Sequence, residues 1–156
     1  MSSKTFERIV KLLEDNQVGY ELLEHEPAFT SEQAAKVRGT NLASGAKALI
    51  FKADKKPIMI VIPGDKRVEI RKFKNQFGIK DLAFAKPEEV EQITEGVKVG
   101  AVHPFGNLHY LPVYVDRALG KIRMIVFNAG LHNKSIKMAY KDYERLTKPI
   151  QGNFTT

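Results

Sequence analysis

Hydrophobic and polar residues recur along this chain with two different spacings, which together predict alternating helices and strands. Apolar residues three to four positions apart predict amphipathic helices over residues 6–15 and 140–146, and a short helix within residues 68–77. Runs rich in β-branched and aromatic residues predict strands at residues 20–24, 48–53, 57–62, 82–85, 112–116, 122–127 and 135–139. Residues 148–156 follow neither spacing and are expected to form a tail.

Capping residues locate two further helices. Thr30 is followed three residues later by Gln33, as in a capping box, so a helix is expected over residues 31–38, ending before a glycine. Pro87 suits the first turn of a helix over residues 87–96, and the two glutamates after it favour the N-terminal end of the helix dipole.

The order of these elements indicates a single α+β domain that spans residues 1–156. The polar turn Asp54-Lys55-Lys56 joins two apolar runs into a hairpin, and hairpins outnumber strand–helix–strand units along the chain. This arrangement predicts a mixed, mostly antiparallel sheet flanked by helices. The sequence contains no internal repeat, low-complexity segment or linker, so no second domain is expected.

The composition limits the chemistry that the chain can perform. The sequence has no cysteine, which excludes disulfides, thiolate metal sites and a cysteine nucleophile. No apolar run reaches the length of a transmembrane helix, and the N-terminus lacks the apolar core of a secretory signal. A cytoplasmic protein without a membrane partner is therefore expected. The net charge of +7 favours a polyanionic partner such as RNA.

The segment Gly100-Ala-Val-His-Pro-Phe-Gly106 is the strongest local candidate for a functional loop. It places two glycines, a proline and a histidine between a predicted helix and a predicted strand. Glycine allows the backbone to approach a ligand closely, and proline fixes φ and removes one donor. The N–H groups that remain can then be presented to an anion or to an oxyanion that develops during a reaction. An ordinary turn explains the same spacing.

Two other groups of polar residues are candidates for ligand binding. Lys47 stands where an apolar strand begins, so its ammonium group could reach a phosphate or carboxylate in a pocket, or could extend into water. Asn128, Gly130 and His132 follow another predicted strand and could bind a ligand or form an ordinary turn.

The sequence contains none of the common motifs for metal, nucleotide or serine chemistry. The four histidines, His25, His103, His109 and His132, lack the spacing and the accompanying carboxylates of a zinc site. No nucleophile elbow, phosphate-binding loop or dinucleotide fingerprint is present. No metal and no cofactor are therefore expected.

Six segments resemble, in their order and spacing, the YbaK/prolyl-tRNA-synthetase-associated domain family. They are His25-Glu-Pro27-Ala-Phe-Thr30-Ser-Glu-Gln-Ala-Ala35, Lys47-Ala-Leu-Ile, Val61-Ile-Pro-Gly-Asp65, Gly100 to Gly106, Val115-Asp116 and Asn128-Ala-Gly130. The resemblance extends from about residue 5 to residue 147. It implies an α+β domain with a strongly curved, barrel-like sheet. It also implies a free-standing hydrolase that removes the amino acid from mischarged tRNA in trans, most often alanine or cysteine from tRNA(Pro).

The resemblance also implies roles for individual residues. The family's lysine corresponds to Lys47, and its GxxxP loop corresponds to Gly100 through Pro104. Lys47, Gly100 and Pro104 form the expected catalytic set. The residues expected to bind substrate are His25, Thr30, Ala101, Val102, His103, Phe105, Gly106, Asp116, Asn128, Gly130 and His132. The expected partners are tRNA and an aminoacyl-tRNA synthetase, without DNA. One departure is Ala48, which stands where family members that clear alanine tend to carry asparagine.

An aminoacyl ester is already activated, so its hydrolysis requires neither a metal nor a covalent intermediate. The N–H groups of residues 100–104 are expected to bind the oxyanion, and Lys47 to bind the terminal phosphate or to hold the adenosine and ester in register. The ribose hydroxyl, a backbone carbonyl or His132 could orient the attacking water. Two alternatives stay open at this point: a non-catalytic module that binds tRNA or a synthetase, and a zinc-dependent hydrolase.

Overall fold

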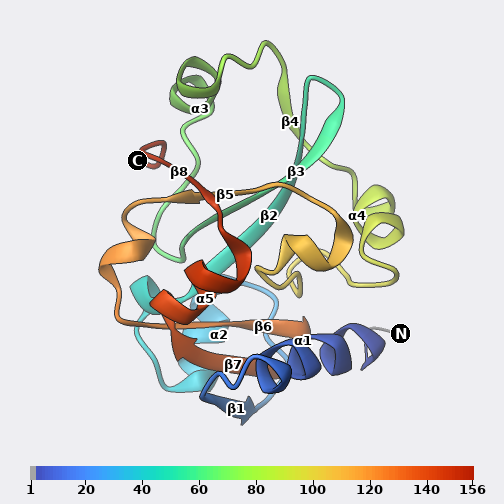
Figure 1. The fold of residues 1–156 in the computed structure, drawn as a ribbon, viewed down its shortest axis with the longest axis vertical. Helices are drawn as coiled ribbons and strands as arrows, with labels where there is room; N and C mark the ends of the chain where they lie inside the picture. Colours follow the sequence, from blue (N-terminus) through green and yellow to red (C-terminus); the bar gives the residue numbers. More distant parts are fainter. Residues whose placement is uncertain (1–2) are drawn as a thin grey trace.

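Two β-sheets, one above the other in Figure 1, form the framework of the protein in the computed structural model, which describes residues 3–156. The five-stranded sheet has the order β4 (Leu82–Phe84), β2 (Ala46–Ala53), β3 (Lys56–Pro63), β5 (Val113–Asp116) and β8 (Ile150–Gly152). The three-stranded sheet has the order β1 (Tyr20–Glu24), β7 (Lys134–Ala139) and β6 (Met124–Leu131).

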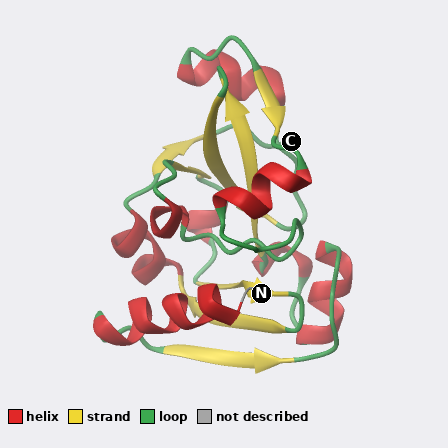
Figure 2. Cartoon of the chain, turned by 90° about the vertical axis from the view of Figure 1, so that its right-hand side faces the viewer, coloured by secondary structure: helices red, strands yellow, loops and turns green. Residues whose placement is uncertain are grey.

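Five α-helices lie around these sheets within the described part of the chain (Figure 2). They are α1 (Ser3–Asp15), α2 (Ser31–Arg38), α3 (Ile70–Phe77), α4 (Pro87–Ile93) and α5 (Tyr140–Thr147). Helix α1 packs along β6, and α3 lies at the far end of the five-stranded sheet (Figure 1). No helix within residues 3–156 has the length and apolar character that crossing a membrane requires.

The strand pairing confirms a mixed, mostly antiparallel α+β architecture. Strands β2 and β3 form the predicted hairpin, with Asp54 and Lys55 at positive φ in a two-residue turn. The pairs β3–β5 and β5–β8 are parallel, and the other pairs are antiparallel. The expectation of one barrel-like sheet is wrong, because β1, β7 and β6 form a separate sheet in which β7 pairs with both of the other strands. A single parallel bridge between Gly45 and Val126 connects the two sheets.

Helix α2 begins and ends at the predicted residues. The Thr30 hydroxyl accepts a hydrogen bond from the Gln33 N–H at 3.1 Å, and Gly39 closes the helix with a φ of 69°. The Gln33 side chain accepts from the N–H of Phe29 rather than from that of Thr30, so the capping box is shifted by one residue. The capping fixes the chain at the entrance of α2, which borders the cavity described below.

The C-terminal residues form a strand and part of the core, so the expected tail at residues 148–156 is wrong. Strand β8 pairs in parallel with β5, and Phe154 is fully buried. Asp116, itself buried, accepts hydrogen bonds from the N–H groups of Phe154 at 2.7 Å and Thr155 at 3.0 Å. Asp116 therefore anchors the C-terminal segment, a structural role where substrate binding was expected.

Strand β6 is longer than predicted, because it continues to Leu131. Asn128 and Gly130 therefore lie within the strand rather than in a loop beyond it. The pairing with β7 shifts between Asn128 and Leu131, and Gly130 adopts a φ of 85° there. This irregularity is a β-bulge, which redirects side chains at the end of a strand. It lies where the Asn128 side chain meets the loop that follows α4.

Two clusters of buried side chains make up the core. The larger cluster includes Ile9, Val61, Phe105, Phe127 and Tyr143, so it joins residues of both sheets, α1 and α5. The smaller cluster packs α3 and the C-terminal segment against the five-stranded sheet, and its members are Phe51, Ala53, Ile58, Ile60, Ile62, Phe73 and Phe154. The cavity described next lies at the border of the larger cluster.

Candidate functional site

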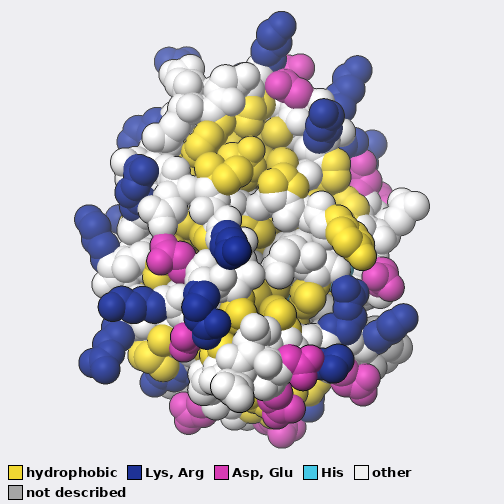
Figure 3. Space-filling model, in the orientation of Figure 1, with side chains coloured by type: hydrophobic (Ala, Val, Ile, Leu, Met, Phe, Trp, Pro, Cys, Tyr) yellow, Lys and Arg dark blue, Asp and Glu magenta, His cyan; other side chains and the backbone are white. Residues whose placement is uncertain are grey.

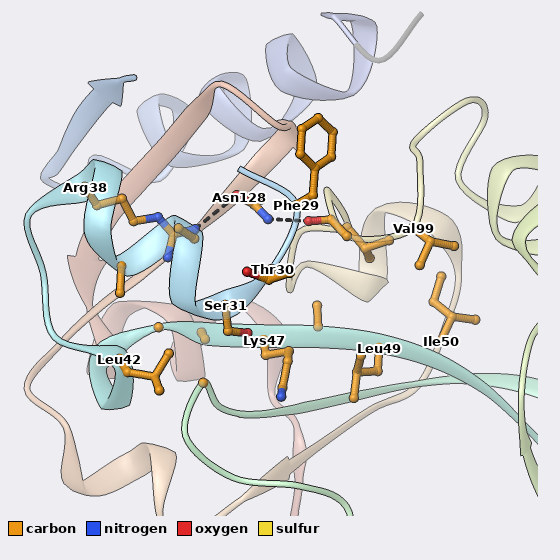
Figure 4. A pocket seen from close by; sticks show the side chains of 18 of the residues that line it. Phe29, Thr30, Ser31, Arg38, Leu42, Lys47, Leu49, Ile50, Val99 and Asn128 are labelled. Carbon is orange, nitrogen blue, oxygen red and sulfur yellow. Dashed lines mark hydrogen bonds between the residues drawn. The ribbon is translucent and has the colours of Figure 1, made fainter. Parts of the chain in front are cut away.

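A cavity of about 280 Å³ lies between α2, the first half of β2 and the loop after α4 (Figure 4). Five residues that the sequence predicts for the site line it: Thr30, Lys47, Gly100, Val102 and Asn128. These residues are far apart in the sequence, and the cavity brings them together.

Other predicted residues lie outside this lining. They are His25, Ala101, His103, Pro104, Phe105, Gly106, Asp116, Gly130 and His132. His132 is nonetheless near the cavity, because its ring packs on that of Phe29 with centroids 4.5 Å apart. Its Nε2 also lies 3.5 Å from the position that a Cβ on Gly100 would occupy.

The loop that contains Gly100 holds its peptide groups in fixed directions. The Asn128 side-chain amide donates to the Gly100 carbonyl at 2.5 Å, and the Ala101 N–H donates to the Lys98 carbonyl at 3.0 Å. Farther along, the Tyr143 hydroxyl donates to the Pro104 carbonyl at 2.8 Å.

This arrangement leaves donors free in the same loop. Among residues 3–156, no group accepts a hydrogen bond from the N–H of Gly100, Val102 or His103. Gly100 has a φ of 89°, a conformation that favours glycine. The loop therefore offers fixed, unpaired N–H groups beside the cavity, as an oxyanion site requires.

Arg38 is the most important site residue that the sequence did not predict. Its Nε donates to the Ser135 hydroxyl at 2.8 Å, and its Nη2 donates to the Asn128 side-chain oxygen at 3.0 Å (Figure 4). Burial lowers the pKa of Arg38 to about 10. Its side chain thus fixes Asn128, which in turn holds Gly100. Arg38 is the last residue of a short helix, where a basic side chain is common because it favours the helix dipole. No local signal in the sequence therefore identifies its contact with Asn128.

His25 lies at the other end of the same hydrogen-bond network. Its Nδ1 is 2.7 Å from the Glu26 carbonyl, and its Nε2 is 2.7 Å from the Ser135 hydroxyl. A neutral ring with its proton on Nδ1 satisfies both contacts, since the Ser135 hydroxyl then donates to Nε2 and accepts from Arg38. His25 was expected to bind substrate, whereas in the structure it contacts the Ser135 hydroxyl, to which Arg38 also donates.

Lys47 borders the cavity from the opposite direction. Its ammonium group donates to the Lys66 carbonyl at 3.1 Å. Partial burial lowers the pKa of Lys47, Glu32 and Asp65 act to raise it, and Arg67 acts to lower it. In Figure 4 the side chain points away from Asn128. The cation therefore lies at the edge of the cavity rather than against the Gly100 loop.

His103 and His109 contact each other below the loop rather than the cavity. Their Nε2 atoms are 2.8 Å apart, and the Phe105 N–H donates to His103 Nδ1 at 3.1 Å. His103 therefore carries its proton on Nε2 and donates to His109. Burial lowers the pKa of both rings, so both are neutral near pH 7. Within residues 3–156 no three His, Asp or Glu side chains are grouped as metal ligands.

The positive charge is distributed rather than concentrated on the face of the molecule that Figure 3 draws. On the face drawn in Figure 3, Lys and Arg side chains are spread around the surface, with Asp and Glu among them. Exposed apolar side chains also border the cavity: Phe29, Phe84 and Val99 are each more than half exposed. The entrance of the cavity is therefore partly apolar, whereas Arg38 and Lys47 bring positive charge to its lining.

Comparisons with known proteins agree on one family. A family model described as the aminoacyl-tRNA editing domain matches residues 25–146. The multifunctional Ser/Thr-tRNA deacylase ProXp-y of Escherichia coli is 29% identical, over 97% of this chain and 93% of that protein. A proline–tRNA ligase of Caldicellulosiruptor bescii is 32% identical, over 76% of this chain but 20% of the ligase. A crystal structure described as a candidate trans-editing enzyme for prolyl tRNA synthetase shares the fold, with a TM-score of 0.85 at 24% identity over 97% of each chain.

Proposed function

The chain belongs to the aminoacyl-tRNA editing domain family, and we propose that it hydrolyses the ester bond between a small amino acid and the terminal adenosine of a mischarged tRNA. The observation that carries this proposal is the position of unpaired N–H groups from the Gly100 loop beside the cavity that Lys47 also borders. The family match and the deacylase named among its relatives support the same reaction.

The proposed mechanism uses the backbone of the loop as the main catalytic group. The N–H groups of Gly100 and Val102 are the candidate donors for the ester oxygen as it gains negative charge. Loss of one such donor typically costs about 3 kcal/mol in the transition state. Asn128 and Arg38 keep the loop in place, because they hold the Gly100 carbonyl on the other side. The ammonium group of Lys47 binds the terminal phosphate or holds the adenosine and ester in register.

The substrate is proposed to carry a small side chain. The cavity is small, at about 280 Å³, which favours a small side chain on the substrate. The family resemblance favours alanine or cysteine on tRNA(Pro), and the proline–tRNA ligase relative is consistent with that tRNA. The name of the Escherichia coli relative instead specifies serine and threonine. Similarity to ProXp-y over 93% of that protein supports action in trans. We place this activity in the cytoplasm, where tRNA is charged. A synthetase is the candidate protein partner.

The test is a deacylation screen of tRNAs charged with alanine, cysteine, serine or threonine, in which tRNA(Pro) is compared with the cognate tRNA of each amino acid. Lys47→Ala should lower turnover at least tenfold while the melting temperature changes little. Lys52→Ala is the matched control, because Lys52 lies on the same strand but pairs with Glu89 outside the cavity. Equal rates for Lys47→Ala and the wild type would remove Lys47 from the mechanism.

A second pair of variants tests the loop. Gly100→Ala should reduce turnover strongly, because a φ of 89° strains any residue with a Cβ. Gly19→Ala is the control, since a Cβ there meets nothing within 4 Å. Near-normal turnover of Gly100→Ala would contradict the oxyanion proposal. Tight binding of tRNA without hydrolysis of any ester would instead indicate the alternative function, a non-catalytic binding module.

A further inference from the structure

The first half of β2 presents an unpaired strand edge to the cavity. The hairpin turn of two residues requires Ala53 and Lys56 to exchange backbone hydrogen bonds. Because bonding alternates along an antiparallel pair, Lys47 and Leu49 bond to β3, whereas Ala46 and Ala48 direct their backbone groups to the opposite side.

An independent contact confirms these directions. The Ala85 N–H donates to the carbonyl of Ile50 at 3.0 Å, so Ile50, two residues after Ala48, points toward the β4 side. Strand β4 pairs only with residues 51–53 of β2. The bridge between Gly45 and Val126 engages only the start of the strand.

The carbonyl groups of Ala46 and Ala48 are consequently free on this side. No described residue pairs with them there, and the six consecutive residues 45–50 all line the cavity. A continuous run of this kind is what a strand edge produces, because a strand seen face-on would contribute every second residue.

Three other side-chain acceptors in the cavity are already engaged. The side-chain oxygens of Thr30, Asn41 and Asn128 accept from Gln33, Ser44 and Arg38 respectively. No aspartate or glutamate lines the cavity, whereas two cations do. A positively charged ligand group would therefore find its acceptors mainly at the strand edge, with the Ser31 hydroxyl as the remaining side-chain candidate.

We propose that one of these edge carbonyls, that of Ala46 or that of Ala48, accepts a hydrogen bond from the α-ammonium group of the aminoacyl substrate. The inference rests on the proposed function, since that reaction brings an α-ammonium group next to the ester. An ammonium group has three donors and no acceptor, so a free backbone carbonyl is a suitable partner for it in a cavity without carboxylates. The ester carbonyl is then left to the N–H donors of the Gly100 loop. An N-acylated ester, such as peptidyl-tRNA, would lose this contact.

The experiment compares two non-hydrolysable ligands that differ only at the α position. Both are RNA minihelices ending in 3′-amino-3′-deoxyadenosine, one acylated with alanine and the other with lactic acid, which replaces the ammonium group with a hydroxyl. At pH 7 the alanyl amide should bind at least tenfold more tightly. Its affinity should decrease as the pH rises through the pKa of its amino group, and the affinity of the lactyl amide should not. Equal affinities within twofold, or the same pH dependence for both ligands, would overturn the proposal.

Ser31→Ala distinguishes the strand edge from the competing side-chain acceptor. The ratio of the two affinities should stay within twofold of the wild-type ratio in this variant, and loss of the preference for alanine would assign the ammonium group to the Ser31 hydroxyl. Hydrolysis of mischarged tRNA is measured alongside. Turnover without a preference between the ligands refutes the edge proposal alone, whereas absence of turnover on every tRNA refutes the proposed function.

Discussion

Replacing Arg38 with methionine should disable the site while the fold remains. The substitution removes hydrogen bonds to Ser135 and Asn128, each donated by a charged group. Such bonds contribute about 1.5–3 kcal/mol each. The pKa of Arg38, lowered to about 10, shows that burial of the guanidinium opposes this gain. We therefore expect a net loss of about 2 kcal/mol, or about 4–8 °C in melting temperature for a chain of this size.

The effect on turnover should exceed the effect on stability. Without Arg38 the Asn128 side chain loses the contact that orients its amide toward the Gly100 carbonyl. A loop that is misplaced by a fraction of an ångström weakens every donor aimed at the oxyanion, so kcat should fall more than tenfold with a smaller change in KM. Arg38→Lys should recover part of the stability and little of kcat, because one ammonium group cannot reach both partners.

A double-mutant cycle with Asn128→Ala tests whether the two residues act as one unit. If they do, the double variant should be little worse in kcat than either single variant. Arg123→Met is the control, because the exposed Arg123 forms no side-chain hydrogen bond or ion pair within residues 3–156. If Arg38→Met lowers the melting temperature but keeps kcat within twofold of the wild type, Arg38 only stabilises the fold and its positioning role is refuted.

Two further predictions concern stability. Asp116→Asn should lower the melting temperature by about 4–8 °C and speed hydrogen exchange at Phe154 and Thr155, because their N–H groups share one carboxylate oxygen; unchanged exchange at both amides would contradict this anchor. The His103–His109 pair should make the protein less stable in acid. Burial lowers the pKa of both rings in the folded state. Their contribution to the free energy of unfolding is therefore complete above about pH 6.5, the ordinary pKa of histidine, and is lost as the pH falls. Urea unfolding between pH 7 and 5 should show this slope, and His103→Gln should flatten it; identical slopes would contradict the assignment.

Local patterns in the sequence were sufficient to predict most elements of this fold. The cap at Thr30 and the hairpin turn at Asp54 and Lys55 depend on residues within four positions of each other, and both occur as expected. Strand β8 was missed because three residues are too few to establish a period, although Ile150 and Phe154 supply apolar side chains in an otherwise polar segment.

The parts of the site that the sequence did not predict depend on contacts between distant segments. Arg38 becomes a site residue only because Asn128 and Ser135, more than eighty positions away, lie beside it. The acceptors at Ala46 and Ala48 belong to the backbone, so no residue type could have indicated them. Lys47 and Gly100, by contrast, were candidates from their local sequence, the family resemblance added their expected roles, and both border the cavity.

The free edge of β2 also bears on how the protein avoids self-association. An exposed strand edge can pair with the edge of another molecule and begin aggregation. Here α2 lies across the cavity from that edge (Figure 4). The helix thus shields the edge from another strand, and variants that loosen α2 should aggregate as well as lose activity.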